Sequence, residues 1–179
     1  MLVSVAAALL LAAFAVALFA SRVPFAHAAN AAVFLKVDGI GSGQQYQNHK
    51  DDFQIKSFSW EESNKGGGGG GGGGGGKVSM GDFQLSLKTV AASTKFFAAA
   101  ASGEHFKKMT LSTELPGGDL VSWELADVLV SGYKVTGPDA DGNTLDQLAI
   151  NFKKIIMTYK PSGQAATQAG WDLNKNNKI

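Results

Sequence analysis

The sequence contains no cysteine among its 179 residues. This absence excludes disulfides, thiolate zinc sites, iron–sulfur clusters and a cysteine nucleophile. The length suits one domain with a short appendage rather than two full domains. Such a domain must be stabilised by its own hydrophobic core or by assembly with other copies.

Arginine is almost absent as well, because Arg22 is the only one in the chain. From about residue 29 onward, 15 lysines balance the 15 aspartates and glutamates. Nucleic-acid recognition depends on a basic surface and on bidentate arginine contacts. We therefore expect no nucleic-acid partner for this neutral domain.

The first 28 residues differ in composition from the rest. Residues 2–20 carry no charge, and as a helix they would extend about 28 Å, at 1.5 Å per residue. Pro24 breaks such a helix, and residues 26–28 (AHA) have the small-x-small pattern of a signal peptidase site. We interpret residues 1–28 as a signal peptide, with an uncleaved N-terminal anchor or a misplaced start as alternatives. After cleavage, the chain from residue 29 onward would have no membrane contact.

Strand patterns dominate residues 29–179. Phe53 and Ile55 alternate with polar residues in one phase and Phe58 and Trp60 in the other, which predicts a bulge near residues 56–57. Further strand-like segments are residues 32–37, 78–88, 109–111, 121–125, 128–130 and 148–159, the last with a bulge-like phase change at residues 153–154. Trp60 and Trp123 fall on apolar faces and are expected in the core, while Trp171 is expected to dock the C-terminal tail.

One segment instead favours a short helix. Residues 96–101 (FFAAAA) follow Ser93, a good N-cap, and precede Gly103, which suits a left-handed helix end. One short helix among about seven strands predicts a mainly β fold. We expect a small closed β-barrel of two packed sheets with the helix on its flank.

Eleven consecutive glycines occupy residues 66–76. Glycine lacks a side chain to pack, so this run predicts a flexible loop spanning residues 65–77. A phosphate-binding loop is an alternative, but Gly76-Lys77-Val78 lacks the Ser or Thr hydroxyl that binds magnesium. A loop that becomes ordered only against a neighbouring subunit is a third interpretation.

Asp139, Asp141 and Asn143 have the spacing of a calcium loop, with Asp146 nearby. Thr144 occupies the glycine position of that motif, and Ile150 replaces its terminal glutamate. Asp141-Gly142 is a common hairpin-turn pair, so we favour a turn over a metal site. No cofactor is expected.

No nucleophile motif occurs in the sequence. His49 and His105 are widely separated and are interpreted as surface or cap residues, not as ligands or bases. The like-charge pairs at residues 51–52 and 61–62 are interpreted as solvated faces. We therefore expect no enzymatic activity.

Several segments together resemble the Hcp (haemolysin-coregulated protein) family, the tube proteins of type VI secretion. Residues 34–40 (FLKVDGI) resemble the family's FLKIDGI opening, and residues 58–60 (FSW) resemble its WSW strand. The glycine run with residues 76–78 (GKV), the alanine-rich helix ending in residues 102–105 (SGEH), residues 127–131 (DVLVS), residues 150–160 (INFKKIIMTYK) and residues 170–173 (GWDL) also match family segments.

The resemblance implies a subunit that forms hexameric rings, which stack into a tube inside a contractile sheath. It also implies contact with a spike protein and transport of small effectors in the ring lumen, which Ser59 is expected to face. Gly66, Gly70, Gly76 and Lys77 would belong to a loop that reaches the next ring. Family members assemble in the cytoplasm and leave by sheath contraction, whereas the predicted signal peptide indicates a secreted protein.

A second interpretation is a secreted monomeric β-barrel that binds carbohydrate or another surface ligand. The two interpretations differ in how strand edges are treated. A monomer should protect its edges with charge, whereas ring subunits pair or pack them.

Overall fold

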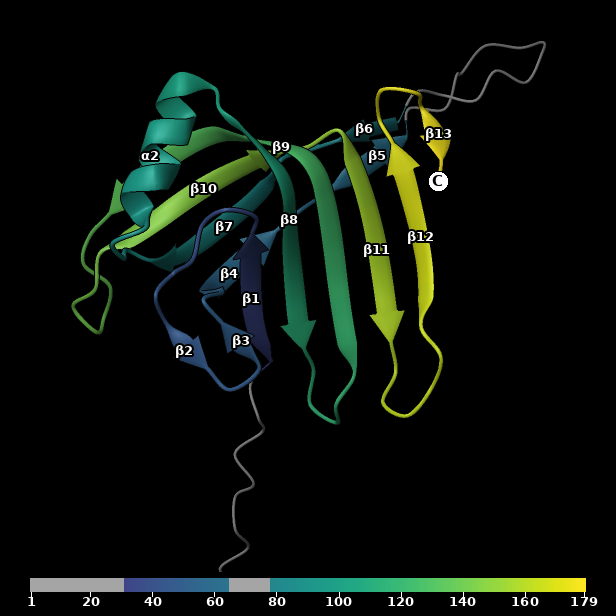
Figure 1. The fold of residues 1–179 in the computed structure, drawn as a ribbon, viewed down its shortest axis with the longest axis horizontal. Coiled ribbons are helices and arrows are strands. Elements are labelled where there is room, and N and C mark those ends of the chain that lie inside the picture. Colours follow the sequence, from purple (N-terminus) through teal and green to yellow (C-terminus); the bar gives the residue numbers. More distant parts are fainter. Residues whose placement is uncertain (1–30, 65–77) are drawn as a thin grey trace, which may run out of the picture.

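The computed structural model describes residues 31–64 and 78–179, and it shows a mainly β fold with one flanking helix (Figure 1). The predicted signal peptide and the glycine loop lie outside these residues. The helix α2 is Ser93–Ser102. The strands are β1 Ala32–Val37, β2 Gln45–Tyr46, β3 His49–Lys50, β4 Phe53–Ser59, β5 Glu62–Asn64, β6 Val78–Met80, β7 Phe83–Lys88, β8 His105–Glu114, β9 Leu120–Thr136, β10 Leu145–Asn151, β11 Lys154–Lys160, β12 Thr167–Asp172 and β13 Asn177–Lys178.

Six of these strands close into a small barrel, as the sequence predicts. The main sheet has the order β10-β7-β4-β1-β8-β9-β11-β12-β13, and β10 pairs a second time with β9. The long strand β9 therefore belongs to the continuous main sheet and also closes the barrel through its pairing with β10. Its first half pairs with β8 and β11, and its second half pairs with β10.

The strands beyond the barrel form an extension that we call the flap, defined as residues 120–126 of β9 together with β11, β12 and β13. The flap continues the β8–β9 sheet away from the barrel (Figure 1). β5 and β6 form a separate two-stranded hairpin.

The barrel interior is filled by aliphatic and aromatic side chains from all six barrel strands and from α2. Phe83, Leu85 and Leu87 alternate inward along β7, as predicted, and each is at most 4% exposed. Trp60 and Trp123 pack against this core but are only partly buried. Trp171 lies in β12, also packs against the core, and pairs with Lys178 near the C-terminus, so its predicted docking role is confirmed.

The bulge predicted near residues 56–57 is confirmed. The register of β4 against β7 shifts between Ile55 and Ser57. This shift lets Ile55 and Phe58, which differ in sequence phase, both contribute to the apolar interior.

Three other predictions about the strands need correction. Residues 78–88 are two strands, β6 and β7, interrupted at residues 81–82. Residues 121–130 belong to a single strand in which Asp127 adopts a left-handed φ of 53°, and local strand propensity did not reveal that continuity. The phase change at residues 153–154 lies at a break between β10 and β11, at residues 152–153, across which both strands keep the same register against β9, so it is not a bulge within one strand.

The helix ends as predicted but begins differently. Gly103 has φ of 73° and its backbone N–H bonds to the Ala99 carbonyl, a left-handed helix end. Ala92 occupies the N-cap position and makes no side-chain cap bond. Ser93 is instead the first helical residue, because its hydroxyl is engaged in the interior with Asp146.

Candidate assembly surface

The flap exposes an apolar face that continues the barrel core outward. Directly paired residues lie on the same face of a sheet, so the register extends a buried row into the flap. One row runs from Leu35 through Leu111 and Trp123 to Met157. Leu35 and Leu111 are each 1% exposed, whereas Met157 is 44% exposed. This row of paired residues therefore continues from the barrel interior onto the flap and stays on the same, apolar face of the sheet.

A second row confirms the pattern at the far end of the flap. Val33 pairs with Thr113, Thr113 with Val121, and Val121 with Tyr159. Tyr159 is 38% exposed although it lies on the same face as these barrel residues. Large apolar side chains exposed together on one face are typical of an interaction surface.

The flap also has an incompletely paired edge. β13 pairs with β12 only at Trp171 and Asp172. The β13 end of the chain also reaches Gly170, whose carbonyl accepts from the Ile179 backbone N–H at 3.1 Å. Residues 167–169 have no partner strand on their outer side within the described part of the chain, and their sequence, TQA, carries no charge. Charge is a common protection of exposed edges in monomeric proteins, and this edge lacks it.

Polar contacts hold the flap against the barrel and fix its shape. Asp119, in the β8–β9 turn, accepts bonds from the Tyr159 hydroxyl at 2.5 Å and the Ser162 backbone N–H at 2.9 Å. These bonds lower the pKa of Asp119, with the Tyr159 bond the larger cause. At the root of the flap, buried Asp172 accepts from the Lys175 backbone N–H and pairs with Lys154 at 3.2 Å. The backbone bond is the main reason that the pKa of Asp172 is lowered.

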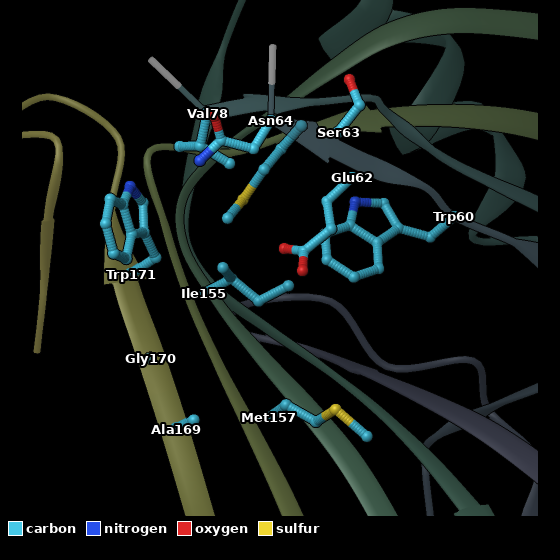
Figure 2. A pocket seen from close by; sticks show the side chains of 11 residues that line it. Trp60, Glu62, Ser63, Asn64, Val78, Ile155, Met157, Ala169, Gly170 and Trp171 are labelled. Carbon is cyan, nitrogen blue, oxygen red and sulfur yellow. The ribbon is translucent and has the colours of Figure 1, made fainter. Parts of the chain in front are cut away.

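A pocket of about 430 Å³ lies between the β5–β6 hairpin and the flap (Figure 2). Its walls are mainly apolar and aromatic: Trp60, Val78, Met80, Ile155, Met157 and Trp171. The Glu62 carboxylate points into the space between Trp60 and Ile155 in Figure 2. The Trp171 indole N–H is buried and has no hydrogen-bond partner among the described residues.

Trp60 is held rigidly on the pocket wall. Its ring stacks on Phe83 with a centroid distance of 5.1 Å and an interplanar angle of 6°. Its indole N–H donates to the Gly81 carbonyl at 3.0 Å. The pocket wall is therefore continuous with the core.

Asp139 is part of a turn, as predicted. Its carboxylate accepts from the backbone N–H groups of Asp141 and Asn143 and pairs with Lys56. The Lys56 contact is the main reason that the pKa of Asp139 falls to about 2. Asp146 lies elsewhere: it is fully buried and binds three hydroxyl groups. No group of three or more metal-ligating side chains occurs within residues 31–64 and 78–179.

The surface interpretation of His49 is wrong. Its side chain is only 14% exposed, and its ring stacks on Phe34 at 3.9 Å. Its two ring nitrogens contact Asp52 at 2.9 Å and Glu114 at 3.0 Å. The side chain of Asp52 is only 13% exposed, so the expectation that it is solvated is also wrong. The cause is that the β2–β3 segment folds over the outer face of β1.

His105 lies at the surface, as predicted, and its Nδ1 contacts Asp127 at 2.6 Å. Lys153 pairs with the same carboxylate at 2.6 Å and is the largest cause of the lowered pKa of Asp127. Both histidines therefore serve structural contacts between strands and turns. Glu61 and Glu62 are exposed, as expected.

The remaining predicted site residues are only partly placed. Ser59 is an exposed residue at the end of β4. Gly66, Gly70, Gly76 and Lys77 lie outside the described residues, between β5 and β6. The flap face and the pocket were missed from the sequence, because alternation shows that β11 has an apolar face but not whether the barrel covers it. The only helix in the described segments has ten residues and is too short to cross a membrane.

Comparisons with known proteins agree with this architecture. The family model "Type VI secretion system effector, Hcp" matches residues 34–159. No curated protein sequence matches the chain.

Solved structures share the fold at low sequence identity. Hcp1 from Salmonella typhimurium is 23% identical, with a TM-score of 0.70 over 83% of this chain and 99% of that one. A type six secretion system protein is 20% identical, with a TM-score of 0.72 over 83% and 99%. A type VI secretion system effector from Yersinia pestis is 20% identical, with a TM-score of 0.65 over 78% and 98%. The family match spans most of the chain and the fold agrees with it, so this protein belongs to the Hcp family of type VI secretion.

Proposed function

We propose that this protein is a structural subunit that assembles into hexameric rings, which stack into a type VI secretion tube. The observation that carries the proposal is the flap, whose apolar face bears Met157 and Tyr159 in exposed positions beside an uncharged edge. A second copy covering this face would remove apolar surface from water, which favours association by about 25 cal/mol per Å². Family membership supports the ring as the form of that association.

The proposal extends to the partners of the tube. In a tube of the family type, the expected contacts are the surrounding sheath, the spike protein at the tip and small effectors in the lumen, which Ser59 would face. A subunit exported through residues 1–28 would be separated from the sheath. The loop of residues 65–77 would reach the next ring. A loop with little intrinsic structure can become ordered against a partner, at an entropic cost that weakens the contact.

The tube subunit has a structural role, so we expect no catalysis and no cofactor. Within the described residues, the histidine and carboxylate contacts join strands and turns. No membrane contact is expected after loss of residues 1–28.

We further propose that residues 1–28 direct export by the general pathway. Mass spectrometry of the mature N-terminus tests this directly. A start near residue 29 on protein outside the cytoplasm is expected, whereas soluble cytoplasmic protein that retains Met1 would contradict it.

The second candidate function is a secreted monomeric binding barrel. The pocket favours it, because two tryptophans, Trp60 and Trp171, line a space of about 430 Å³ that a ligand ring could enter. The mass of the purified protein separates the two functions. The tube subunit should be a hexamer, and the binding barrel should stay monomeric at high concentration.

A further inference from the structure

The β2–β3 hairpin lies over the outer face of β1 and depends on side-chain contacts to stay there. Each of its strands has only two residues. An isolated two-stranded hairpin is at best marginally stable in water, so this one needs the barrel. Two rings supply the apolar part of the contact: His49 stacks on Phe34 at 3.9 Å, and Tyr46 tilts against the same ring at 5.2 Å. Phe34 is only 5% exposed because these rings cover it.

Both ring nitrogens of His49 face a carboxylate. Nδ1 lies 2.9 Å from Asp52 Oδ2, and Nε2 lies 3.0 Å from Glu114 Oε1. An ionised carboxylate only accepts hydrogen bonds, and a neutral imidazole has only one N–H to donate. A neutral ring would therefore leave one nitrogen lone pair facing a carboxylate oxygen. The imidazolium form donates to both carboxylates, so the geometry fits the charged ring.

No other cation competes for these two carboxylates. Neither Asp52 nor Glu114 has a second ionic partner within the described residues. The Tyr46 hydroxyl contacts the side chains of Gln44 and Gln54 instead of the imidazole. The other charged side chains on this side of β1 and on the hairpin are exposed and form no ion pair in the described part of the chain: Lys36, Lys50 and Asp51.

We propose that His49 is a pH-sensitive clasp, which holds the β2–β3 hairpin on β1 while both ring nitrogens carry a proton and releases it when one proton is lost. The clasp stabilises the hairpin where the ring is charged, and this contribution falls as the pH rises and the proton leaves. Release would uncover the apolar ring of Phe34 on the outer face of β1. All of these residues belong to one chain, so the clasp does not depend on ring assembly.

Hydrogen–deuterium exchange, read by mass spectrometry on the full chain as the cell processes it, tests the clasp. The reporter is the peptide of residues 41–52, in which Ser42 donates to the Asp51 carbonyl and Asp51 donates to the Gln44 carbonyl. The exchange is compared at pH 5.5 and pH 8.5, on either side of the range in which histidine ordinarily titrates. After correction for the intrinsic exchange rates, we expect about tenfold greater protection at pH 5.5, because the charged ring makes one hydrogen bond more.

Three variants separate the clasp from other sources of pH dependence. His49→Gln can still bond one carboxylate but cannot become charged, so its hairpin should exchange fast at both pH values. His105→Gln is the matched control, because His105 is the other histidine of the described residues and is exposed. It should keep the wild-type pH dependence. Glu114→Gln removes one carboxylate at a side chain that is 46% exposed, and we expect a smaller gain in protection at pH 5.5.

Two results would overturn the clasp. Protection of residues 41–52 that is equal at both pH values in the wild-type chain would show that the hairpin does not respond to the proton. A pH dependence that is unchanged in His49→Gln would place the titrating group elsewhere. Should that variant fail to fold, Glu114→Gln decides, since the full wild-type gain in that variant would count equally against the clasp.

Discussion

Single residues in this protein carry contacts that their sequence context does not reveal. Asp146 follows a polar turn and resembles a candidate calcium ligand, yet it is fully buried. Its carboxylate accepts from the hydroxyls of Thr89 at 2.8 Å, Tyr133 at 3.0 Å and Ser93. This network joins the start of α2 to β9 and β10. Burial and the bond to Asp146 raise the pKa of Tyr133 to about 12.

Asp146→Ala should destabilise the fold strongly. The substitution leaves three hydroxyl groups without their acceptor, and bonds to a charged group contribute about 1.5–3 kcal/mol each. We expect the free energy of unfolding to fall by about 3 kcal/mol in urea denaturation. Asp141→Ala is the control, since that side chain is 78% exposed and should change stability little. Equal stability of the two variants would contradict the structural role of Asp146.

Because Lys56 and Asp139 form an ion pair, we expect the stability of the folded protein to fall in acid. The pKa of Asp139 is lowered in the folded state, from 3.8 to about 2, so its contribution to stability is present above pH 4. That contribution is lost as the pH falls through the folded-state pKa. Lys56→Met should therefore lower the melting temperature at pH 6 and have little effect near pH 2. A difference between wild type and variant that stays constant from pH 6 to pH 2 would count against this assignment.

For strands and helices, sequence patterns correctly predict the features that depend on residues close together in the sequence. The inward alternation of Phe83, Leu85 and Leu87, the bulge between Ile55 and Ser57 and the left-handed stop at Gly103 were all predictable. Each depends on side-chain periodicity or on backbone freedom within a few residues. The start of α2 was not predictable, because Ser93 binds Asp146, which lies 53 residues away in sequence.

Gly103→Ala should weaken the end of α2. No atom lies within 4 Å of an added Cβ there, so the cost is conformational and comes from φ of 73°. We expect a loss of about 1 kcal/mol on thermal unfolding. Gly103→Asn should lose less, because asparagine tolerates the left-handed region better. An alanine variant as stable as wild type would contradict this account of the helix end.

At the scale of the whole molecule, β9 decides the architecture. Its first half carries the flap and its second half closes the barrel. The sequence predicts the barrel and the family, but it could not show which strand lies at the edge or which apolar face stays uncovered. Met157 and Tyr159 alternate like core residues, and only the three-dimensional path of β11 places them outside the barrel.

The glycine run should govern ring stacking more than folding. Shortening Gly66–Gly76 to five glycines removes no side chain and slightly lowers the entropic cost of loop closure. We expect unchanged thermal unfolding and intact single rings, with tubes absent in electron micrographs. Tubes that persist with the shortened loop would refute its stacking role.

The proposed function depends on the assembly of this Hcp-family chain into hexameric rings. Light scattering coupled to size-exclusion chromatography, on the purified processed chain over a range of concentrations, tests it most directly. The expected result is the mass of six chains, which persists on dilution until the rings dissociate. A mass of one chain at the highest concentration would contradict the ring and favour the secreted monomeric barrel.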